Sequence, residues 1–584
     1  MHDSIYVILL LGVFMFAILL ITSQNYNLDS IKRKQVGDGQ HGTARFADKK
    51  DINEAYKVVK YTPELWRQGK NLPTEQGIIV GCYGENPTYA YVDTGDVHCL
   101  MIGAAGVGKT AYFLYPNIEY ALASGMSFLS TDTKGDVYRN YGAIARDYYG
   151  YDVIVIDLRN PLQSDAWNMM NLVNEYMDSY LSNPSRIGDL AKAEKYAKII
   201  AKTIIYSDGT TTNYGQNQFF YDAAEGLLAS VILIVAQYAE KKERHIISVY
   251  KTIQDLLSPG QNGKSKFHEM MSKLPNNHRA RWLAGAALNT AEQSMQSVLS
   301  TALARLNAFL DTEMEQILCV ESRLNVENVC KNKTAIFIVL PEEDPTKFFL
   351  ATLFIQQVYR ETLSFADENG GKLPRRVVFY WDEYGTMPTI QSAEMMFSAG
   401  RSRRLTIVAI IQSYAQLNKN YTENGAEIII DNCQLTIFGG FAPSSKTADE
   451  LSRSMGNYTA LAGSVSRNKG EPSQSLDMIE RPLMTSDELK SMKKGNFIVM
   501  KTGVPPMRAK FKLFFKWGIK FDKEYVPEVR QPEKIEYADV SRIIHAITGK
   551  KEVPTFKVND LKMQDELKGI FKRASKEDKQ NEVS

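Results

Sequence analysis

Seven short runs of apolar, largely β-branched residues constrain the fold of this chain more than any other feature of its sequence. Each run is nearly continuous and ends at a polar residue or a glycine. The runs are HCLMIG at 98, MSFLSTD at 126, DVIVID at 152, TAIFIVLP at 334, VVFYWDE at 377, LTIVAIIQS at 405 and LTIFGG at 435. Strands that are buried on both faces of a parallel sheet have this pattern, and helical stretches separate the runs. The sequence therefore predicts a doubly wound α/β fold.

The strand pattern is interrupted between residues 171 and 330, where the spacing of apolar residues is helical. Apolar residues recur at steps of three or four through residues 187–204. Residues 219–239 and 291–310 repeat this periodicity. We expect an all-α domain at residues 171–330, inserted into the α/β domain.

The insertion divides the α/β domain into two parts, which we place at residues 25–170 and 331–520. A chain of 584 residues exceeds what a single core usually organises, so more than one domain is expected. Beyond residue 520 lysine and glutamate dominate, with nearly balanced charge. We interpret residues 521–584 as a solvated tail, helical or partly disordered.

An uncharged segment near the N-terminus, IYVILLLGVFMFAILLI at residues 5–21, predicts a membrane anchor within residues 1–24. As a helix it would rise about 25 Å, the short end of what crosses a bilayer. A signal peptide would need basic residues before the segment and a small-residue cleavage site after it, and neither is present. A buried core helix is the weaker alternative. The basic run at 32–34 predicts that the N-terminus lies outside and the rest of the chain in the cytoplasm.

Net charge, cysteine spacing and one incomplete motif argue against a globally basic nucleic-acid-binding surface, a disulfide framework and a zinc protease. The formal net charge is +2, so any nucleic-acid surface must be a local patch. The five cysteines show no CxxC spacing, which argues against a disulfide framework or a zinc site and fits a reducing compartment. The sequence HEMMS at 268 lacks the second histidine of a zinc protease motif.

The stretch GAAGVGKT at residues 103–110 matches the pattern GxxxxGK[ST]. A strand run precedes it and a helix start follows it, which is the context that a phosphate-binding loop requires. Backbone amides at the helix start face the phosphates, a lysine neutralises the β- and γ-phosphates, and a threonine ligates Mg²⁺. The sequence thus predicts a site for ATP and Mg²⁺; the alternative is a glycine-rich turn without a ligand. The residues expected to bind nucleotide are Gly103, Gly106, Gly108, Lys109, Thr110 and Ala111.

Hydrolysis needs an acidic site, and three strand runs end in aspartate, at Asp132, Asp157 and Asp382. Any of the three could merely cap the following helix. Only Asp382 is followed by a second acid, Glu383. We expect Asp382 to complete the Mg²⁺ shell with Thr110, and Glu383 to polarise the attacking water.

Two further features extend the predicted catalytic set. Gln412 follows a strand run and is expected to sense the γ-phosphate or to orient water, although it could be a helix-cap amide. One of Arg401, Arg403 and Arg404, with Arg401 as our candidate, is expected to reach the phosphate of a neighbouring subunit as an arginine finger. A solvated basic turn explains the three arginines almost as well, and the sequence does not choose among them.

Taken in order, these motifs resemble the type IV secretion coupling proteins of the TraG/TraD kind. Three further segments match motifs of that family: HGTARF at 41–46, DTKGD at 132–136 and RPLM at 481–484. The resemblance spans residues 40–505. The chain departs from the family in having one predicted membrane span where relatives often have two. It also has AAGV in the loop where relatives often carry proline and serine.

The resemblance implies a RecA-like P-loop nucleotide-binding domain with a helical domain on top. It also implies a ring, expected to be a homo-hexamer, at the inner face of the bacterial cytoplasmic membrane, with ATP between subunits. The implied activity is an ATPase that brings relaxase-bound DNA, or a protein, to the channel proteins of a type IV secretion system. DNA contact would be independent of base sequence.

Local support for DNA contact comes from a basic stretch in the predicted helical domain. Its basic residues are Lys264, Lys266, Lys273, Arg279 and Arg281. Few acids lie between them, so contact with phosphates is one interpretation, and an ordinary solvated helical face is the other.

Two alternative functions are kept open. The first is a chromosome DNA pump of the FtsK kind, for which several membrane spans and a winged-helix DNA reader would be expected. The second is a receptor that binds ATP without turnover and recruits secretion substrates to the membrane.

Overall fold

A computed structural model of the protein describes residues 39–84, 86–206, 217–258, 265–340, 347–387, 389–390, 392–466 and 473–549. The predicted membrane segment at residues 5–21 and residues 550–584 lie outside these ranges. The chain divides into two compact units. The first comprises residues 1–167, 206–212 and 311–533, and the second comprises residues 168–205, 213–310 and 534–584.

The first unit is organised around a nine-stranded mixed sheet with the order β14-β13-β10-β4-β9-β8-β5-β7-β6. Its strands are β4 (Cys99–Ile102), β5 (Ser127–Asp132), β6 (Asp152–Asp157), β7 (Thr334–Val339), β8 (Val377–Trp381), β9 (Leu405–Ile411), β10 (Leu435–Phe438), β13 (Asn496–Lys501) and β14 (Val504–Lys510). The seven strands predicted from the apolar runs are all present and pair in parallel. Two antiparallel strands, β13 and β14, complete one edge.

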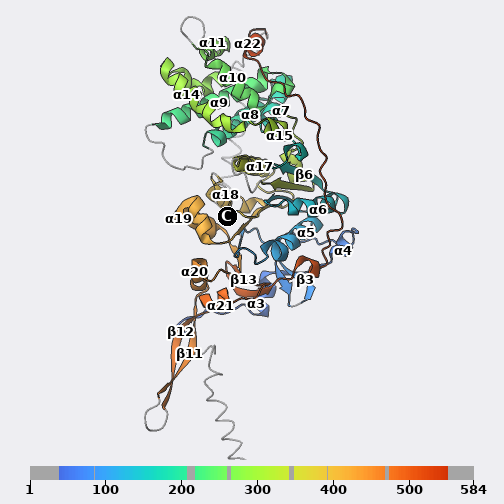
Figure 1. Cartoon of the computed structure of the whole chain (residues 1–584), viewed down its shortest axis with the longest axis vertical. Coiled ribbons are helices and arrows are strands. Elements are labelled where there is room, and N and C mark those ends of the chain that lie inside the picture. The colour runs from blue at the N-terminus through green and yellow to red at the C-terminus, as the bar shows by residue number, and fades with distance from the viewer. Residues whose placement is uncertain are drawn as a thin grey trace, which may run out of the picture. The chain divides into compact units, whose positions relative to one another are not determined.

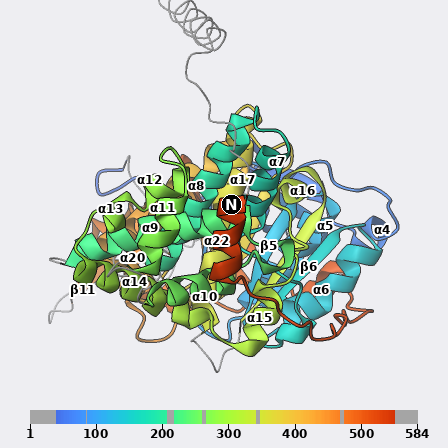
Figure 2. The same ribbon diagram turned by 90° about the horizontal axis from the view of Figure 1, so that it is seen from above.

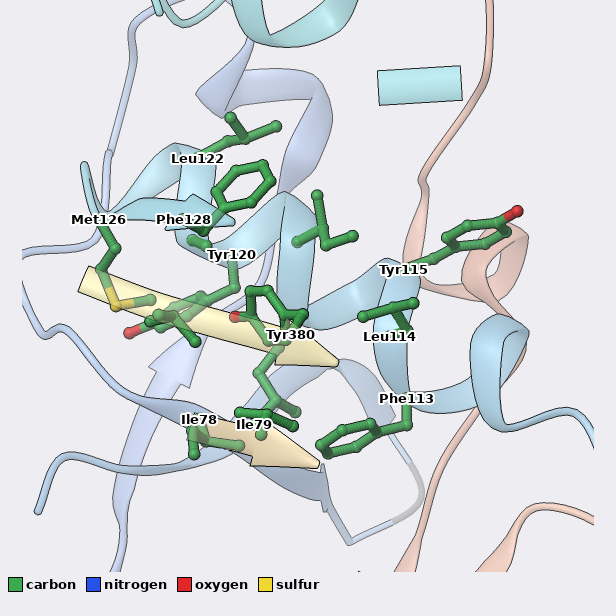
Figure 3. Close-up of a cluster of buried hydrophobic side chains, with 14 of the residues drawn as sticks. Ile78, Ile79, Phe113, Leu114, Tyr115, Tyr120, Leu122, Met126, Phe128 and Tyr380 are labelled. Carbon is green, nitrogen blue, oxygen red and sulfur yellow. The ribbon is translucent and has the colours of Figure 1, made fainter. Parts of the chain in front are cut away.

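Helices cover both faces of this sheet, as the alternation of side chains along β8 shows. Val378 and Tyr380 point into the core that also holds helix α5 (Tyr115–Ala123), whose neighbourhood is drawn in Figure 3. Phe379 and Trp381 point to the opposite face, where their rings contact Tyr359 and Phe397. Burial on both faces explains why β8 and its neighbours read as continuous apolar runs.

The first unit contains the following helices, several of which flank the sheet in Figure 1. They are α3 (Lys49–Ala55), α4 (Pro63–Trp66), η1 (Thr110–Leu114), α5, α6 (Asp136–Asp147), η2 (Pro161–Gln163), α15 (Thr312–Leu318), α16 (Val326–Lys331), α17 (Phe348–Glu368), α18 (Ala393–Ala399), η8 (Arg401–Arg403), α19 (Tyr414–Asn432), α20 (Lys446–Ser454), α21 (Ser486–Lys490) and η9 (Phe514–Trp517). Tyr359 belongs to α17 and Phe397 to α18, so these two helices cover the face opposite α5.

Two smaller β elements accompany the main sheet. Strands β1 (Lys57–Lys60), β2 (Ile78–Tyr83) and β3 (Asn86–Asp93) form an antiparallel sheet. Strands β11 (Asn457–Ser466) and β12 (Ser473–Pro482) form a ribbon that projects beyond α20 and α21 in Figure 1.

The segment HGTARF at 41–46 lies against the base of this ribbon. Thr43 forms a β-bridge with Tyr458. Gly42 has φ +133°, and a Cβ there would overlap the backbone carbonyl of Asn457. Only glycine permits this approach, which gives the second residue of the motif a structural reason.

The described elements of the second unit are helices, several of which appear together in Figure 2. They are α7 (Asn171–Ser182), α8 (Ile187–Ile205), α9 (Gln218–Tyr238), η4 (Lys241–Glu243), α10 (Ile246–Leu256), α11 (Lys266–Lys273), α12 (Arg279–Leu283), α13 (Gly285–Leu288), α14 (Glu292–Leu306), η6 (Asn307–Phe309) and α22 (Val540–Gly549). Among the described residues, α9 is long and apolar enough to span a bilayer, but 67% of its most apolar window is buried within the protein. Its contacts with α8, α10, α12 and α14 make it the core helix of this unit.

The segment that follows residue 520, predicted as a solvated tail, contacts the first unit through two aromatic side chains. Phe521 and Tyr525 pack against the core of the first unit. A Cβ on Gly142 would lie 2.5 Å from the Tyr525 ring, so α6 and this segment fit closely. Phe521 and Tyr525 are half-buried while the residues between them are exposed, so two aromatic rings fasten a charged, solvent-facing segment to the first unit.

Candidate active site

The loop at residues 103–109 connects β4, in the middle of the main sheet, to the π-helical turn η1. Gly106 and Gly108 adopt φ +75° and +88°, values that a residue with a side chain rarely adopts. A Cβ on Gly108 would also lie 2.8 Å from the Tyr112 ring. Because the loop follows β4, it lies at the carboxyl ends of the parallel strands, where ligands of open α/β sheets bind.

A second pair of glycines, which the sequence analysis missed, supports this loop. The amide of Ala104 donates a hydrogen bond to the carbonyl oxygen of Gly440, at 2.8 Å. A Cβ on Gly440 would lie 2.5 Å from Val107. The signal was present in LTIFGG, where Gly439 and Gly440 follow the strand that pairs with β4.

Lys109 is 6% exposed, and its ammonium lies against the loop itself. The Nζ atom donates hydrogen bonds to the carbonyl oxygens of Gly103, at 2.8 Å, and of Ala104, at 3.4 Å. Burial lowers the pKa of Lys109, and the nearby carboxyl groups of Glu383 and Asp382 oppose that shift. A buried cation at the start of a helix is well placed to bind a phosphate group.

Asp382, directly after β8, faces the first residue of η1. The hydroxyl of Thr110 donates to Asp382 Oδ2 at 3.5 Å. Burial raises the pKa of Asp382 to about 6; Glu383 reinforces the shift and Lys109 opposes it. A hydroxyl and a carboxylate oxygen are ligands that Mg²⁺ prefers, so Thr110 and Asp382 suit a divalent cation accompanying a phosphate.

Glu383 is held in an unusual conformation beside Asp382. Its φ of +53° is uncommon for a residue other than glycine and is often found at functional sites. Its carboxylate oxygen Oε2 accepts a hydrogen bond from Gln412 Nε2 at 3.1 Å. The structure thus brings together Glu383 and the amide that the sequence places after β9.

Gln412 is itself fixed by a residue that the sequence analysis did not single out. The backbone amide of Gln412 donates to Gln416 Oε1 at 2.9 Å. A Cβ on Gly385 would overlap the same Gln416 side chain, so glycine at 385 makes room for it. Gln416 thus links the connection after β9, which holds Gln412, to the connection after β8, which holds Gly385.

The other two aspartates that end strands bind backbone amides of the segments that follow them. The Asp132 carboxylate accepts from the amides of Gly135, at 2.7 Å, and Val137, at 2.8 Å, at the start of α6. Asp157 accepts from the amide of Arg159 at 2.8 Å. Asp382 is the one of the three whose carboxylate faces Thr110.

Arg401 is not brought to this site within the same chain. It lies in η8, immediately before β9, whereas the loop, Asp382 and Gln412 all follow the strands β4, β8 and β9. Because these strands are parallel, Arg401 lies at the opposite edge of the sheet from Lys109. Arg401 and Arg404 are exposed, and Arg403 pairs with Asp367 at 2.7 Å.

The raised pKa of Asp382 makes a stability prediction for the protein without nucleotide and Mg²⁺. A carboxyl whose pKa is raised on folding stabilises the folded state at low pH, and this contribution is lost as pH rises through about 6. Replacing Asp382 by asparagine removes the buried charge. We expect the variant to melt roughly 2 °C or more above the wild type at pH 8, with the gap narrowing towards pH 4.5. Differential scanning calorimetry across this pH range measures the difference in melting temperature. A variant that is no more stable than the wild type at pH 8 would contradict the burial of a charge at Asp382.

The family model for "Type IV secretory system Conjugative DNA transfer" matches residues 46–544 of the chain. A conjugal transfer protein TraG of Escherichia coli is 22% identical over 540 residues, covering 85% of this chain and 79% of the relative. The type IV secretion system-coupling protein VirD4 of Bartonella henselae is 20% identical over 457 residues, covering 76% of this chain and 68% of the relative.

The solved structures of the bacterial conjugative coupling protein TrwB share the fold. The unbound monoclinic form of TrwBdeltaN70 has a TM-score of 0.54 and 15% identity, and covers 85% of this chain and 99% of that one. TrwB in complex with ADP and Mg²⁺ also has a TM-score of 0.54, with 14% identity and coverage of 85% and 100%. At this identity the likeness establishes the α/β architecture with its large mixed sheet.

Proposed function

Because this chain belongs to the type IV secretory system conjugative DNA transfer family, we propose that it is a membrane-anchored coupling ATPase. It brings relaxase-bound DNA, or a protein, to a type IV secretion channel and drives transfer by hydrolysing ATP. The observation that carries the proposal is the convergence of Lys109, Thr110, Asp382 and Glu383 at one edge of the main sheet.

The nucleotide site follows from the loop geometry. The amides of the loop and of the start of η1 bind the phosphates, in the set Gly103, Gly106, Gly108, Lys109, Thr110 and Ala111. Mg²⁺ held by Thr110 and Asp382 supplies charge neutralisation on the phosphates. TrwB, which shares the fold, has been solved with the ATP analogue ADPNP and with ADP and Mg²⁺, which supports these ligands.

Glu383 is the proposed general base. Its carboxylate takes the proton of the attacking water, and Gln412 orients that carboxylate through the 3.1 Å hydrogen bond. The γ-phosphate would compete for the same amide of Gln412. Gln412 is therefore suited to report whether the γ-phosphate is present.

We propose that the second unit's helices within the predicted range 171–330 form an all-α domain inserted into the RecA-like domain, whereas α15 and α16 belong to the first unit. The subunits assemble as a homo-hexameric ring. The position of Arg401 at the opposite edge of the sheet supports a role in a neighbouring subunit's site. A ring built from head-to-tail contacts brings opposite surfaces of adjacent subunits together.

This arrangement predicts complementation between two inactive variants. Arg401→Ala should lower ATP turnover by about 10³-fold or more, as expected for an arginine finger, and Lys109→Ala should abolish it. Rings reconstituted from a mixture of the two should regain activity, since an intact loop can face an intact arginine. The regained activity is measured as ATP turnover of the purified mixtures, with Arg404→Ala in place of Arg401→Ala as the matched control. Mixtures as inactive as their components would rule out Arg401 acting between subunits.

The membrane anchor is proposed to be a single pass that leaves the bulk of the chain in the cytoplasm. Deleting residues 1–24 should release a soluble protein whose ring assembly is weakened. Fractionation of cells and light scattering of the purified protein measure the two effects. If the shortened protein still sediments with membranes, the anchor assignment is wrong.

A further inference from the structure

Trp282 is the most exposed tryptophan of the chain and lies on the surface of the second unit. Its side chain is 57% exposed, whereas the other four are between 0% and 3% exposed. Those four are Trp66, Trp167, Trp381 and Trp517. The active site does not use Trp282, because it belongs to the helical unit and follows none of the strands of the main sheet.

The Trp282 ring is held in a fixed orientation. Its Nε1 donates to the carbonyl oxygen of Asn276 at 3.0 Å. The guanidinium of Arg279 lies over the ring, 4.5 Å from its centroid. Arg279 is in turn anchored to Glu194 on α8, with Nε 3.2 Å from the carboxylate. The indole is therefore an ordered flat surface paired with a cation.

The bond between Arg279 and Glu194 places this indole next to a row of lysines. Lys198 and Lys202 follow Glu194 by one and two helical turns on α8, so the three side chains share one face. Both lysines are exposed. We call Trp282 and Arg279, together with the face of α8 that carries Glu194, Lys198 and Lys202, the indole surface.

The basic residues singled out in the sequence contribute unequally to this region. Arg281 donates to the carbonyl oxygen of Leu274 at 3.0 Å and to Asn276 Oδ1 at 2.9 Å, so it holds the loop before α12. Lys273 is exposed at the end of α11. Lys264 lies outside the described residues.

We propose that the indole surface binds single-stranded nucleic acid, with a base stacked on Trp282 and phosphates contacted by Lys198 and Lys202. Aromatic rings beside a basic track bind unpaired bases without reading sequence, and a duplex keeps its bases stacked inside. Trp and Arg are also common in protein interfaces, but lysine is depleted there, so the lysine row favours a polyanion. The inference rests on the proposed function in one respect: it identifies where the transferred DNA contacts this chain.

The single exposed indole allows a direct measurement on the full-length protein in detergent without nucleotide. Binding of a single-stranded oligothymidylate should quench the exposed part of the intrinsic fluorescence, and Trp282→Phe should remove that signal. Trp282→Ala should weaken binding of the oligothymidylate about tenfold. It should leave unchanged the binding of an abasic oligonucleotide of the same length.

The lysines should behave differently from the indole. Replacing Lys198 and Lys202 together by alanine should weaken the binding of both oligonucleotides to the same extent and reduce the salt dependence of binding. Phe219→Ala, which removes another exposed aromatic residue of the same unit, is the matched control and should change neither. Basal ATP turnover should be normal in all of these variants, because none of the residues lies in the active site.

Each of the following results would overturn the proposal: no binding of oligothymidylate by the wild type, unchanged affinity in Trp282→Ala, equal loss for the abasic oligonucleotide, or equal loss for a duplex. Loss of plasmid transfer in cells by Trp282→Ala, with oligonucleotide binding intact, would assign the surface to a protein partner and also overturn it. Failure of the proposed ATPase function can be told apart from failure of this proposal. A wild-type protein that binds oligothymidylate through Trp282 but does not hydrolyse ATP would contradict only the ATPase function.

Discussion

Lys109→Ala is expected to abolish nucleotide binding, and with it ATP turnover and plasmid transfer. The Lys109 ammonium is buried and bonds to two carbonyl oxygens of the loop, so it is preorganised for a phosphate. Removing one partner of a buried ionic contact typically costs several kcal/mol, so the affinity for ATP should fall roughly 100-fold or more. Titration calorimetry with ATP and Mg²⁺ measures the loss.

The control for this variant is Lys446→Ala, which removes an exposed lysine at the start of α20 in the same unit. It should bind ATP as the wild type does. A Lys109→Ala protein with normal ATP affinity and normal transfer would show that residues 103–110 are not the nucleotide site.

Glu383→Gln is expected to stop hydrolysis while nucleotide binding is kept. The amide has the shape of the carboxylate, and its oxygen can still accept the hydrogen bond from Gln412, but it cannot take a proton from water. Loss of a general base typically lowers turnover about 10²- to 10⁴-fold. Single-turnover hydrolysis and ATP affinity, measured on the same preparation, separate the two effects, with Glu423→Gln on the exposed face of α19 as control.

The same variant decides between a motor and a receptor. If ATP turnover is lost and plasmid transfer in cells is undiminished, the protein recruits substrates without needing hydrolysis, and the coupling ATPase proposal is wrong. If turnover itself is undiminished, Glu383 is not the base. Loss of both turnover and transfer is the expected result.

The sheet could be predicted because burial on both faces leaves a direct mark on the sequence. Strand β8 alternates between two cores, so every position of VVFYW is apolar or aromatic. Strand β13 still shows a short apolar run, FIVM at 497–500. Strand β14, at the sheet edge, is half-buried over most of its length and leaves no comparable run.

Apart from Arg401, the residues predicted for the site follow a strand or lie in the loop and the helix start after it, where one local pattern suffices. Gly440 and Gln416 were missed because Gly440 contacts the loop after β4 and Gln416 packs on Gly385, both of which are distant in sequence. Of the three aspartates that end strands, only Asp382 is followed by a second acid in the sequence. The structure adds that the Asp132 and Asp157 carboxylates bind nearby backbone amides, whereas that of Asp382 faces Thr110.

Strand β9 has one further consequence for the proposed ring. Arg401 stands just before it and Gln412 immediately after it, so a single straight segment, about 23 Å long at the usual rise per residue, joins the two. A stiff extended backbone transmits a shift at one end to the other. With Arg401 in the active site of the next subunit, as proposed, release of phosphate beside Gln412 would shift Arg401 in that neighbouring site. ATP hydrolysis would then proceed around the ring sequentially rather than at random.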